Sequence, residues 1–283
     1  RENNMDYRQK LTEKQKIVIK IGTSTITYPE SGEINIGKLE KFVRILINLR
    51  NEGKEVIVVS SGAVGIGRNV LGFDKRPEGK AEKQACAAVG QARLMMMYEK
   101  IFAEYGQVAA QVLLTKEAIV NESCARNAKQ TFEKLSEMKV VPVVNENDAV
   151  SVDEEAYGNF GDNDTMAAYV ASLVEADLLI LMSDIEGLYT DDPKKNPEAR
   201  FIHTVGRIDQ RLEAMGKGAG SENGTGGMST KIQAAKIATA SGTDMVIANG
   251  SNIFTINEVM EGKEIGTLFL SSAGGAGRIQ GSY

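Results

Sequence analysis

The chain has 283 residues with 42% apolar side chains, which is enough for a buried core in one large α/β domain or two small ones. Its formal net charge is −5 and it contains no long basic run, which argues against a surface built for nucleic acid. The longest apolar runs, such as residues 178–182, are far shorter than a membrane-spanning helix. We therefore expect a globular, cytoplasmic protein.

Short apolar strands alternate with amphipathic helices along most of the chain. The strands are predicted at residues 16–21, 55–60, 108–115, 140–145, 177–182, 201–205, 245–249 and 266–270. The helices are predicted at about 38–54, 81–105, 122–137, 164–175, 208–215, 229–241 and 255–261. Nearly continuous apolar strands between such helices are typical of a mostly parallel sheet covered on both faces. Since no repeat or linker interrupts the pattern, we expect one domain over residues 16–270, with tails at 1–15 and 271–283.

Two residue types that often carry chemistry are scarce. Cys86 and Cys124 are far apart in helix-like segments, which argues against a disulfide framework or a zinc site. His203 is the only histidine, so a Ser-His-Asp triad would have to use it, and we interpret it as structural. No protein-held metal site is predicted.

The segments that follow the strands combine glycine with hydroxyl or carboxylate side chains. They read GTST, SSGAVG, NENDAV and SDIEGLYT in chain order. Ligands of open α/β sheets bind at the carboxyl ends of the strands. The pattern therefore predicts a ligand site at this edge of the sheet.

Lys20 is unusual because it interrupts the Ile/Val run of the first strand. An ammonium group there costs free energy unless it faces a partner or an anion. Its side chain either extends to solvent at the edge of the strand or reaches the ligand crevice and neutralises phosphate charge.

The glycine-rich stretch SSGAVGIG (60–67) fits neither of two familiar motifs. Val59 occupies the first glycine position of a nucleophile elbow. Gly62, Gly65 and Gly67 do not give the spacing of a dinucleotide fingerprint. What remains is a strand-to-helix turn, either an ordinary one or one whose backbone N–H groups bind a phosphate or carboxylate.

Two acidic stretches allow a structural and a functional interpretation. GDND (161–164) could cap a helix, or it could hold lysines with one carboxylate and a polar substrate with its amide. Met166 excludes an EF-hand loop, because Asp or Asn is needed at that position. NEND (145–148) is either a turn or a similar set of polar groups for a ligand.

GTGGMSTK (224–231) is not a Walker phosphate loop, because Ser229 and Thr230 precede Lys231 and Ile232 follows it. One interpretation is a surface loop before a helix that is capped by Ser229 or Thr230. The other is an anion site, in which backbone N–H groups, the helix dipole and the charge of Lys231 act together.

Taken together, the motifs resemble those of the amino acid kinase family over about residues 16–270. They are VIKIGTST, VVSSGAVGIGR, AAVGQARLM, VPVVNENDAV, GDND, SDIEGLYTDDP and GTGGMSTKIQAA. NENDAV with GDND is similar to the branch that phosphorylates the side-chain carboxylate of L-glutamate with ATP, the first step of proline biosynthesis. The resemblance implies a three-layer α/β fold with a central, mainly parallel sheet between helices. It also implies that the N-terminal half binds the acceptor and the C-terminal half binds ATP.

The resemblance also assigns residue roles by motif. Lys20 and Lys231 would stabilise the transferring phosphoryl group, and Asp164 would orient both lysines. The acceptor would be bound by Ser61, Gly62, Asp148, Asp162 and Asn163. ATP would be bound by Lys20, Gly22, Ser183, Asp184, Thr225, Gly226, Gly227, Met228, Ser229, Thr230 and Lys231. Mg²⁺ would be held mainly by the phosphates of the nucleotide.

Further expectations depend on the resemblance alone: a dimer or tetramer, feedback inhibition by proline, and the absence of the C-terminal PUA domain that many members carry, because few residues follow Leu270. Ser60 and Ser183 stand where the family pattern has Thr. The alternatives are an acetylglutamate, carbamate, aspartate or uridylate kinase, or a non-catalytic nucleotide-binding regulator on the same fold.

Overall fold

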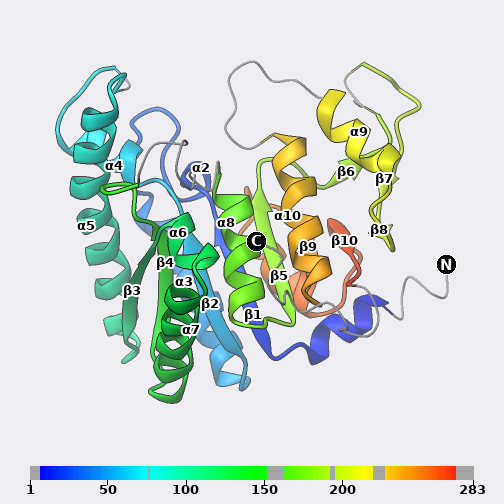
Figure 1. The fold of residues 1–283 in the computed structure, drawn as a ribbon, viewed down its shortest axis with the longest axis horizontal. Coiled ribbons are helices and arrows are strands. Elements are labelled where there is room, and N and C mark those ends of the chain that lie inside the picture. The colour runs from blue at the N-terminus through cyan, green and yellow to red at the C-terminus, as the bar shows by residue number, and fades with distance from the viewer. Residues whose placement is uncertain (1–6, 76, 152–161, 192–194, 219–226, 272–283) are drawn as a thin grey trace. The chain divides into compact units, whose positions relative to one another are not determined.

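The computed structural model describes residues 7–75, 77–151, 162–191, 195–218 and 227–271, without the side chains of 216–218 (Figure 1). The chain divides into two compact units. Unit 1 comprises Arg1–Lys20 and Gly161–Tyr283, and unit 2 comprises Ile21–Phe160. Each unit is an α/β structure with its own strands and covering helices.

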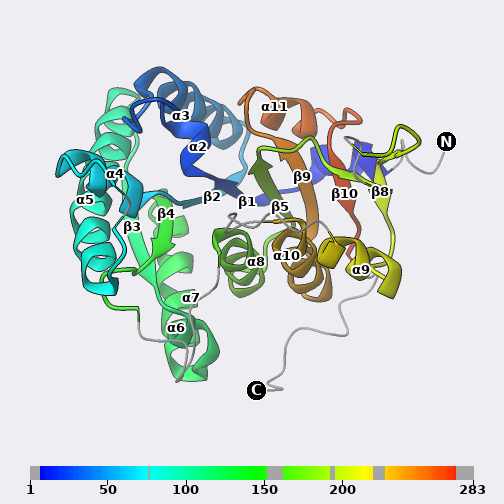
Figure 2. The same ribbon diagram turned by 90° about the horizontal axis from the view of Figure 1, so that it is seen from above.

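Unit 2 has three parallel strands in the order β3-β4-β2. The strands are β2 (Glu55–Ser60), β3 (Ala109–Leu114) and β4 (Val141–Glu146). The helices are α2 (Thr23–Ile26), α3 (Ile36–Asn51), α4 (Ala63–Val70), α5 (Lys80–Glu104), α6 (Lys116–Val120) and α7 (Glu122–Glu137). Helices α3 and α7 lie on opposite faces of these strands (Figure 2). Helix α3 buries the apolar positions that recur at helical spacing in its sequence, including Leu39, Phe42 and Leu46.

Unit 1 has strands in the order β1-β5-β9-β10-β8, of which β9 and β10 alone pair antiparallel. These strands are β1 (Lys16–Ile21, in this unit up to Lys20), β5 (Leu178–Ser183), β9 (Asp244–Asn249), β10 (Thr267–Phe269) and β8 (Thr204–Val205). A separate hairpin joins β6 (Leu188–Tyr189) and β7 (Phe201–Ile202). The helices are η1 (Lys10–Glu13), α8 (Asn163–Leu173), α9 (Gln210–Gly218), α10 (Met228–Ala240) and α11 (Thr255–Met260). Helices α8 and α10 lie side by side on one face, and α11 lies on the other (Figure 2).

The expected fold class, a mainly parallel sheet between helices, is confirmed. Each predicted strand and helix is present, with ends that differ by a few residues. The predicted strand 201–205 is divided into β7 and β8 at His203, and these two strands pair with different partners. The short elements η1, α2, α6 and β6 escaped prediction, because a few residues are too few to show a hydrophobic period. For α4 the sequence predicted only a strand-to-helix turn and no helix bounds.

The polar N-terminal segment belongs to unit 1 from Tyr7 onward, although its sequence suggests a tail. The Arg8 side chain is 1% exposed. Its guanidinium donates hydrogen bonds to the backbone carbonyls of His203 and Gly266, at 2.7 and 2.9 Å, and to that of Ile265. Burial lowers the pKa of Arg8 to about 10. Hydropathy cannot reveal such a residue, because backbone carbonyls rather than acidic side chains accept its hydrogen bonds.

Within the described part of the chain, no helix has the length and apolar character that crossing a membrane requires. Cys86 is buried in α5 and Cys124 is exposed on α7, and both are free thiols. These positions agree with the interpretation of both cysteines as helix residues.

Helices α4 and α5 pack with their backbones in direct contact. A Cβ atom on Gly67 would lie 1.8 Å from the carbonyl oxygen of Cys86, and one on Gly90 would lie 1.7 Å from that of Ala63. No side chain larger than hydrogen fits at either position without moving a helix. Since Ala63 begins α4 directly after β2, this contact fixes the position of the α4 N-terminus.

The α4–α5 contact predicts that Gly90→Ala destabilises the protein, although alanine favours helices. We expect the free energy of unfolding to fall by about 1–3 kcal/mol, because the helices must separate. Urea unfolding followed by circular dichroism measures this. Gly37→Ala is the control, because Gly37 is exposed in α3 and a Cβ there makes only an ordinary contact of 3.6 Å. Equal stability of the two variants would contradict the close packing of α4 and α5.

Candidate active site

Three charged side chains that are far apart in the sequence meet inside unit 1. The Asp164 carboxylate lies between two ammonium groups. Lys20 Nζ is 2.7 Å from Asp164 Oδ1, and Lys231 Nζ is 3.0 Å from Asp164 Oδ2. The exposed fractions of the three side chains are 13% for Lys20, 4% for Asp164 and 6% for Lys231. The cluster is therefore largely removed from water.

A different element supplies each member of this cluster. Lys20 lies near the carboxyl end of β1, beside Leu181 of the parallel strand β5. Asp164 lies in the first turn of α8, and Lys231 lies in the first turn of α10. Because α8 and α10 are neighbours on the same face, the starts of both helices come together beside the end of β1 (Figure 1). Of the two interpretations of Lys20, the structure excludes the one in which it extends to solvent.

Asp162 fixes the start of α8. Its carboxylate accepts hydrogen bonds from the backbone N–H groups of Asp164 and Thr165, at 2.7 and 2.8 Å, as an N-cap does. Burial and the neighbouring charge of Asp164 raise the pKa of Asp162. The capping interpretation of GDND is therefore confirmed for Asp162, while Asp164 of the same motif faces the two lysines.

The start of α10 differs from the expected cap. Gly227 is the N-cap residue and the helix begins at Met228, so neither Ser229 nor Thr230 is the cap. The Thr230 hydroxyl instead donates to the carbonyl oxygen of Gly227 at 2.7 Å. Since a glycine cap has no side chain to accept a hydrogen bond, the first N–H groups of α10 have neither a helical carbonyl nor a capping side chain among the residues that the structure describes. Such a helix start can bind an anion.

Opposing effects determine the charge state of Asp164. Burial alone would raise the pKa of its carboxyl group, but the ammonium groups of Lys20 and Lys231 outweigh burial and hold the pKa below its ordinary value of 3.8. Asp164 is therefore ionised at neutral pH. Among these three side chains, two ammonium groups face one carboxylate, a local charge balance that favours an anion.

Unit 1 also contains other residues that the sequence assigns to the site. Asn163 begins α8, and its Oδ1 atom is buried without a hydrogen-bond partner among the described residues. Ser183 ends β5, and its hydroxyl donates to the Asp184 carboxylate at 3.1 Å. Thr225 and Gly226 lie outside the described residues.

The remaining expected site residues belong to unit 2. Gly22 is the N-cap of α2. Ser61 follows β2, is buried, and donates its backbone N–H to the carbonyl oxygen of Ile21 at 3.3 Å. Gly62 has φ +110°, and a Cβ atom there would lie 2.4 Å from the Thr23 hydroxyl oxygen, so this turn requires glycine.

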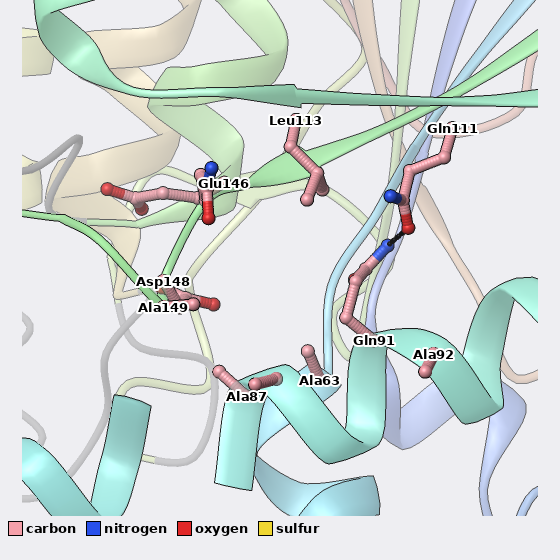
Figure 3. Close-up of a pocket in the computed structure, with 11 residues that line it drawn as sticks. Ala63, Ala87, Gln91, Ala92, Gln111, Leu113, Glu146, Asp148 and Ala149 are labelled. Atoms are coloured by element: carbon pink, nitrogen blue, oxygen red, sulfur yellow. Dashed lines mark hydrogen bonds between the residues drawn. The ribbon is translucent and has the colours of Figure 1, made fainter. Parts of the chain in front are cut away.

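Asp148 lines a cavity of about 270 Å³ in unit 2 (Figure 3). Alanines from α4 and α5 form one side of the cavity, and residues of β3 and of the segment after β4 form the other. Burial raises the pKa of the Asp148 carboxyl. Asp148 and Glu146 are the charged residues among the lining, so the cavity has negative character.

Two residues of this cavity, Gln91 and Gln111, were not predicted from the sequence. Gln91 lies inside the motif AAVGQARLM, to which no role was assigned. Gln111 is the one polar residue in the apolar run of β3, a signal of the kind that drew attention to Lys20. Lone polar residues in apolar strands can therefore indicate both sites in this chain.

A protein-held metal site and a histidine-based triad find no support in the described ranges. No cluster of three or more His, Cys, Asp or Glu residues that could hold a metal ion occurs there. The His203 side chain is 47% exposed, and its Nδ1 atom lies 3.1 Å from Glu264 Oε1. This position agrees with the structural interpretation of His203.

Comparison with known proteins identifies the class of the chain. Residues 15–249 match the model of the amino acid kinase family, so the chain belongs to this family. Solved structures of the fold include isopentenyl phosphate kinase of T. acidophilum, with a TM-score of 0.60 and 19% identity over 90% of this chain and 100% of that one. Carbamate kinase of Giardia lamblia, bound to AMP-PNP, has a TM-score of 0.64 and 14% identity over 92% of this chain and 100% of that one.

The names of curated relatives are more specific than the family model. The glutamate 5-kinase of Clostridium perfringens is 47% identical over 94% of this chain and 99% of its own length. The glutamate 5-kinase of Carboxydothermus hydrogenoformans is 51% identical over 93% of this chain and 69% of its own length. These relatives confirm the expected class of enzyme, a kinase.

The shared carboxylate predicts a pH-dependent contribution to stability. Asp164→Asn leaves two buried ammonium groups without their counter-charge, so at neutral pH we expect the free energy of unfolding to fall by about 3 kcal/mol. Because the pKa of Asp164 is lowered from 3.8, its stabilisation is fully present above about pH 4 and is lost as the pH falls through the lowered pKa. The difference between wild type and variant should therefore shrink in acid. Urea unfolding at a series of pH values measures it, and a difference independent of pH would contradict the ion cluster.

Proposed function

We propose that the chain transfers the γ-phosphoryl group of ATP to the side-chain carboxylate of L-glutamate, forming L-glutamyl 5-phosphate, the first step of proline biosynthesis. The observation that carries this proposal is the buried Lys20–Asp164–Lys231 cluster, in a chain whose full-length relatives are named glutamate 5-kinase. The cluster supplies positive charge, and the relatives indicate the acceptor.

The chemistry requires positioning and charge neutralisation more than proton transfer. A carboxylate oxygen of glutamate attacks the γ-phosphorus, the bond to the β-phosphate oxygen breaks, and ADP leaves with that electron pair. A glutamate side chain with a pKa of about 4.3 is already ionised at neutral pH, so no general base is needed. This agrees with a chain whose one histidine is half exposed and lies beside Glu264.

The two lysines have the roles of charge stabilisers. Lys20 and Lys231 neutralise the negative charge on the oxygens of the transferring phosphoryl group, which a site that excludes water makes more effective. Asp164 is a positioning residue that holds both ammonium groups at opposite oxygens of one carboxylate. The binding of nucleotide phosphate then depends on the two ammonium groups that Asp164 holds in place.

The nucleotide would be held by the start of α10 together with Ser183 and Asp184. The N–H groups of the first turn, near Gly227 and Met228, suit phosphate oxygens. Mg²⁺ would arrive on the β- and γ-phosphates and reduce their charge, which requires few or no protein ligands. The residues present fit such an ion, because the cluster offers charge to phosphates and no carboxylate cage to a metal.

The acceptor would be recognised by its ammonium and carboxylate groups. The Asp148 carboxylate in the cavity of unit 2 suits the α-ammonium group of glutamate. By family resemblance, Ser61 and Gly62 of unit 2 and Asp162 and Asn163 of unit 1 would complete the proposed set. The proposal thus assigns acceptor binding to the N-terminal half of one domain spanning residues 16–270, and ATP binding to its C-terminal half.

Three further parts of the proposal depend on family resemblance. They are assembly into a dimer or tetramer, feedback inhibition by proline, and a cytoplasmic location. Proline carries the same α-carboxylate and α-nitrogen as glutamate, so a cavity that recognises these groups could admit both molecules.

The choice of acceptor can be tested by trapping the acyl phosphate with hydroxylamine. Purified protein is given ATP and Mg²⁺ with glutamate, acetylglutamate, aspartate or carbamate in separate reactions. We expect hydroxamate from glutamate and little product from the others, because the side-chain carboxylate must reach the phosphoryl group while the free α-ammonium group is bound. Turnover with another acceptor and none with glutamate would overturn the proposal.

The role of Lys231 predicts a loss of turnover on substitution. We expect Lys231→Ala to lower kcat by about 10²–10³-fold, as the loss of one preorganised electrostatic group does. Lys236→Ala is the control on the same helix, because Lys236 is 38% exposed and pairs with Glu213 at 2.6 Å. Steady-state kinetics measure kcat of both variants, and circular dichroism verifies that they fold. Near wild-type turnover of a folded Lys231→Ala protein would contradict the assignment.

A further inference from the structure

Three amide side chains form a hydrogen-bonded chain in unit 2, and two of them, Gln91 and Gln111, line the cavity. Asn145 Nδ2 donates to Gln91 Oε1 at 2.8 Å. Gln91 Nε2 donates to Gln111 Oε1 at 3.0 Å, the bond that Figure 3 marks with a dashed line. Asn145 is 2% exposed and Gln91 is 8% exposed, so the first two members are buried. Gln111 is exposed on β3 and lines the cavity together with Gln91.

One backbone group determines the direction of this chain. The backbone N–H of Glu146 donates to Asn145 Oδ1 at 2.9 Å, and a backbone N–H can only donate. The NH₂ group of Asn145 must therefore face Gln91, which must accept with its oxygen and donate with its nitrogen. Reversing any one amide would place oxygen against oxygen or NH₂ against NH₂ and would leave these polar groups without a hydrogen bond, which is unfavourable.

The chain ends with a hydrogen-bond donor at the cavity. Since Gln111 Oε1 accepts from Gln91, the NH₂ group of Gln111 is the free end of the chain. In Figure 3 the Gln111 nitrogen points away from Gln91, along the cavity wall toward Leu113. The opposite side of the cavity carries Glu146 and Asp148. The described cavity lining contains no lysine or arginine, so a carboxylate bound there must rely on hydrogen-bond donors.

From this arrangement we infer that the Gln111 side-chain amide binds the α-carboxylate of the amino-acid acceptor, and that Gln91 is the positioning residue that keeps the Gln111 NH₂ group facing it. The inference rests on the proposed function and adds a specificity determinant to it. The acceptor then lies with its α-ammonium group toward Asp148 and its α-carboxylate toward Gln111. Each charged group of an α-amino acid thus meets a complementary wall.

A comparison of acceptors tests this inference. The variant is Gln111→Glu, which replaces the donor with a carboxylate at an exposed position and so leaves folding intact. The acceptors are glutamate, 4-aminobutyrate, which lacks the α-carboxylate, and isoglutamine, whose α-amide can donate. Gln130→Glu is the matched control, because Gln130 is exposed on α7 and does not line the cavity.

For Gln111→Glu we expect kcat/KM with glutamate to fall about 10²-fold, mainly through KM, because the new carboxylate repels the α-carboxylate and removes its donor. For 4-aminobutyrate, kcat/KM is measured if it is a substrate and Ki if it is a competitive inhibitor. Either constant should change by less than about threefold, because this molecule does not use Gln111. Isoglutamine should become the better acceptor of the variant. Gln130→Glu should leave all three constants unchanged.

Gln91→Glu tests the positioning role separately. A carboxylate at this position accepts from Asn145 but cannot donate to Gln111, so the Gln111 amide is free to turn its oxygen to the cavity. We expect a higher KM for glutamate, with kcat, the KM for ATP and the constant for 4-aminobutyrate nearly unchanged. Gln91→Met, which keeps the volume and removes the hydrogen bonds, serves as the second variant if burial of the glutamate prevents folding.

Two outcomes distinguish failure of the inference from failure of the proposed function. If wild type phosphorylates glutamate but Gln111→Glu weakens the binding of glutamate and of 4-aminobutyrate equally, the α-carboxylate is bound elsewhere. The inference is then wrong, while the proposed function stands. If wild type does not phosphorylate glutamate, the proposed function and the inference fall together.

Discussion

The sharing of one buried carboxylate by two ammonium groups is the interaction on which the proposed chemistry of this molecule depends. Lys20 and Lys231 would repel each other at this separation, and burial would penalise both charges, if Asp164 did not lie between them. The same carboxylate cannot neutralise both lysines completely. The three side chains therefore place two ammonium groups beside one carboxylate in a site largely removed from water, where a phosphate group is a strong partner.

The fold supplies this cluster through the starts of two neighbouring helices and the end of one strand. Asp162 caps α8 and so places Asp164, whereas the N-cap of α10 is Gly227, which has no side chain to cap the helix. The cavity of unit 2 has the opposite character: its charged lining groups are carboxylates, and its donor is an amide held in direction by buried hydrogen bonds. One part of the chain thus suits phosphate, and the other suits an ammonium group beside a carboxylate.

Much of the fold and part of the candidate site could be predicted from the sequence. The apolar strands and amphipathic helices carry strong periodic signals, and Lys20 was conspicuous because a charge inside an apolar strand needs a reason. Features that depend on partners far along the chain were missed. Arg8 is satisfied by backbone carbonyls, and the direction of Gln111 is determined by a backbone N–H near Asn145. Of the two interpretations of GTGGMSTK, the one with Ser229 or Thr230 as the cap of α10 is wrong, because both residues lie inside the helix.

A ¹³C NMR titration of the Asp164 carboxyl tests the central claim most directly. In wild type we expect the signal to remain that of an ionised carboxylate down to pH values below 3.8, because two ammonium groups hold the pKa low. In the double variant Lys20→Met, Lys231→Met, burial acts alone, so the same carboxyl should titrate above its ordinary pKa. Identical titration in both proteins would show that Asp164 does not hold the two lysines, and would contradict the account.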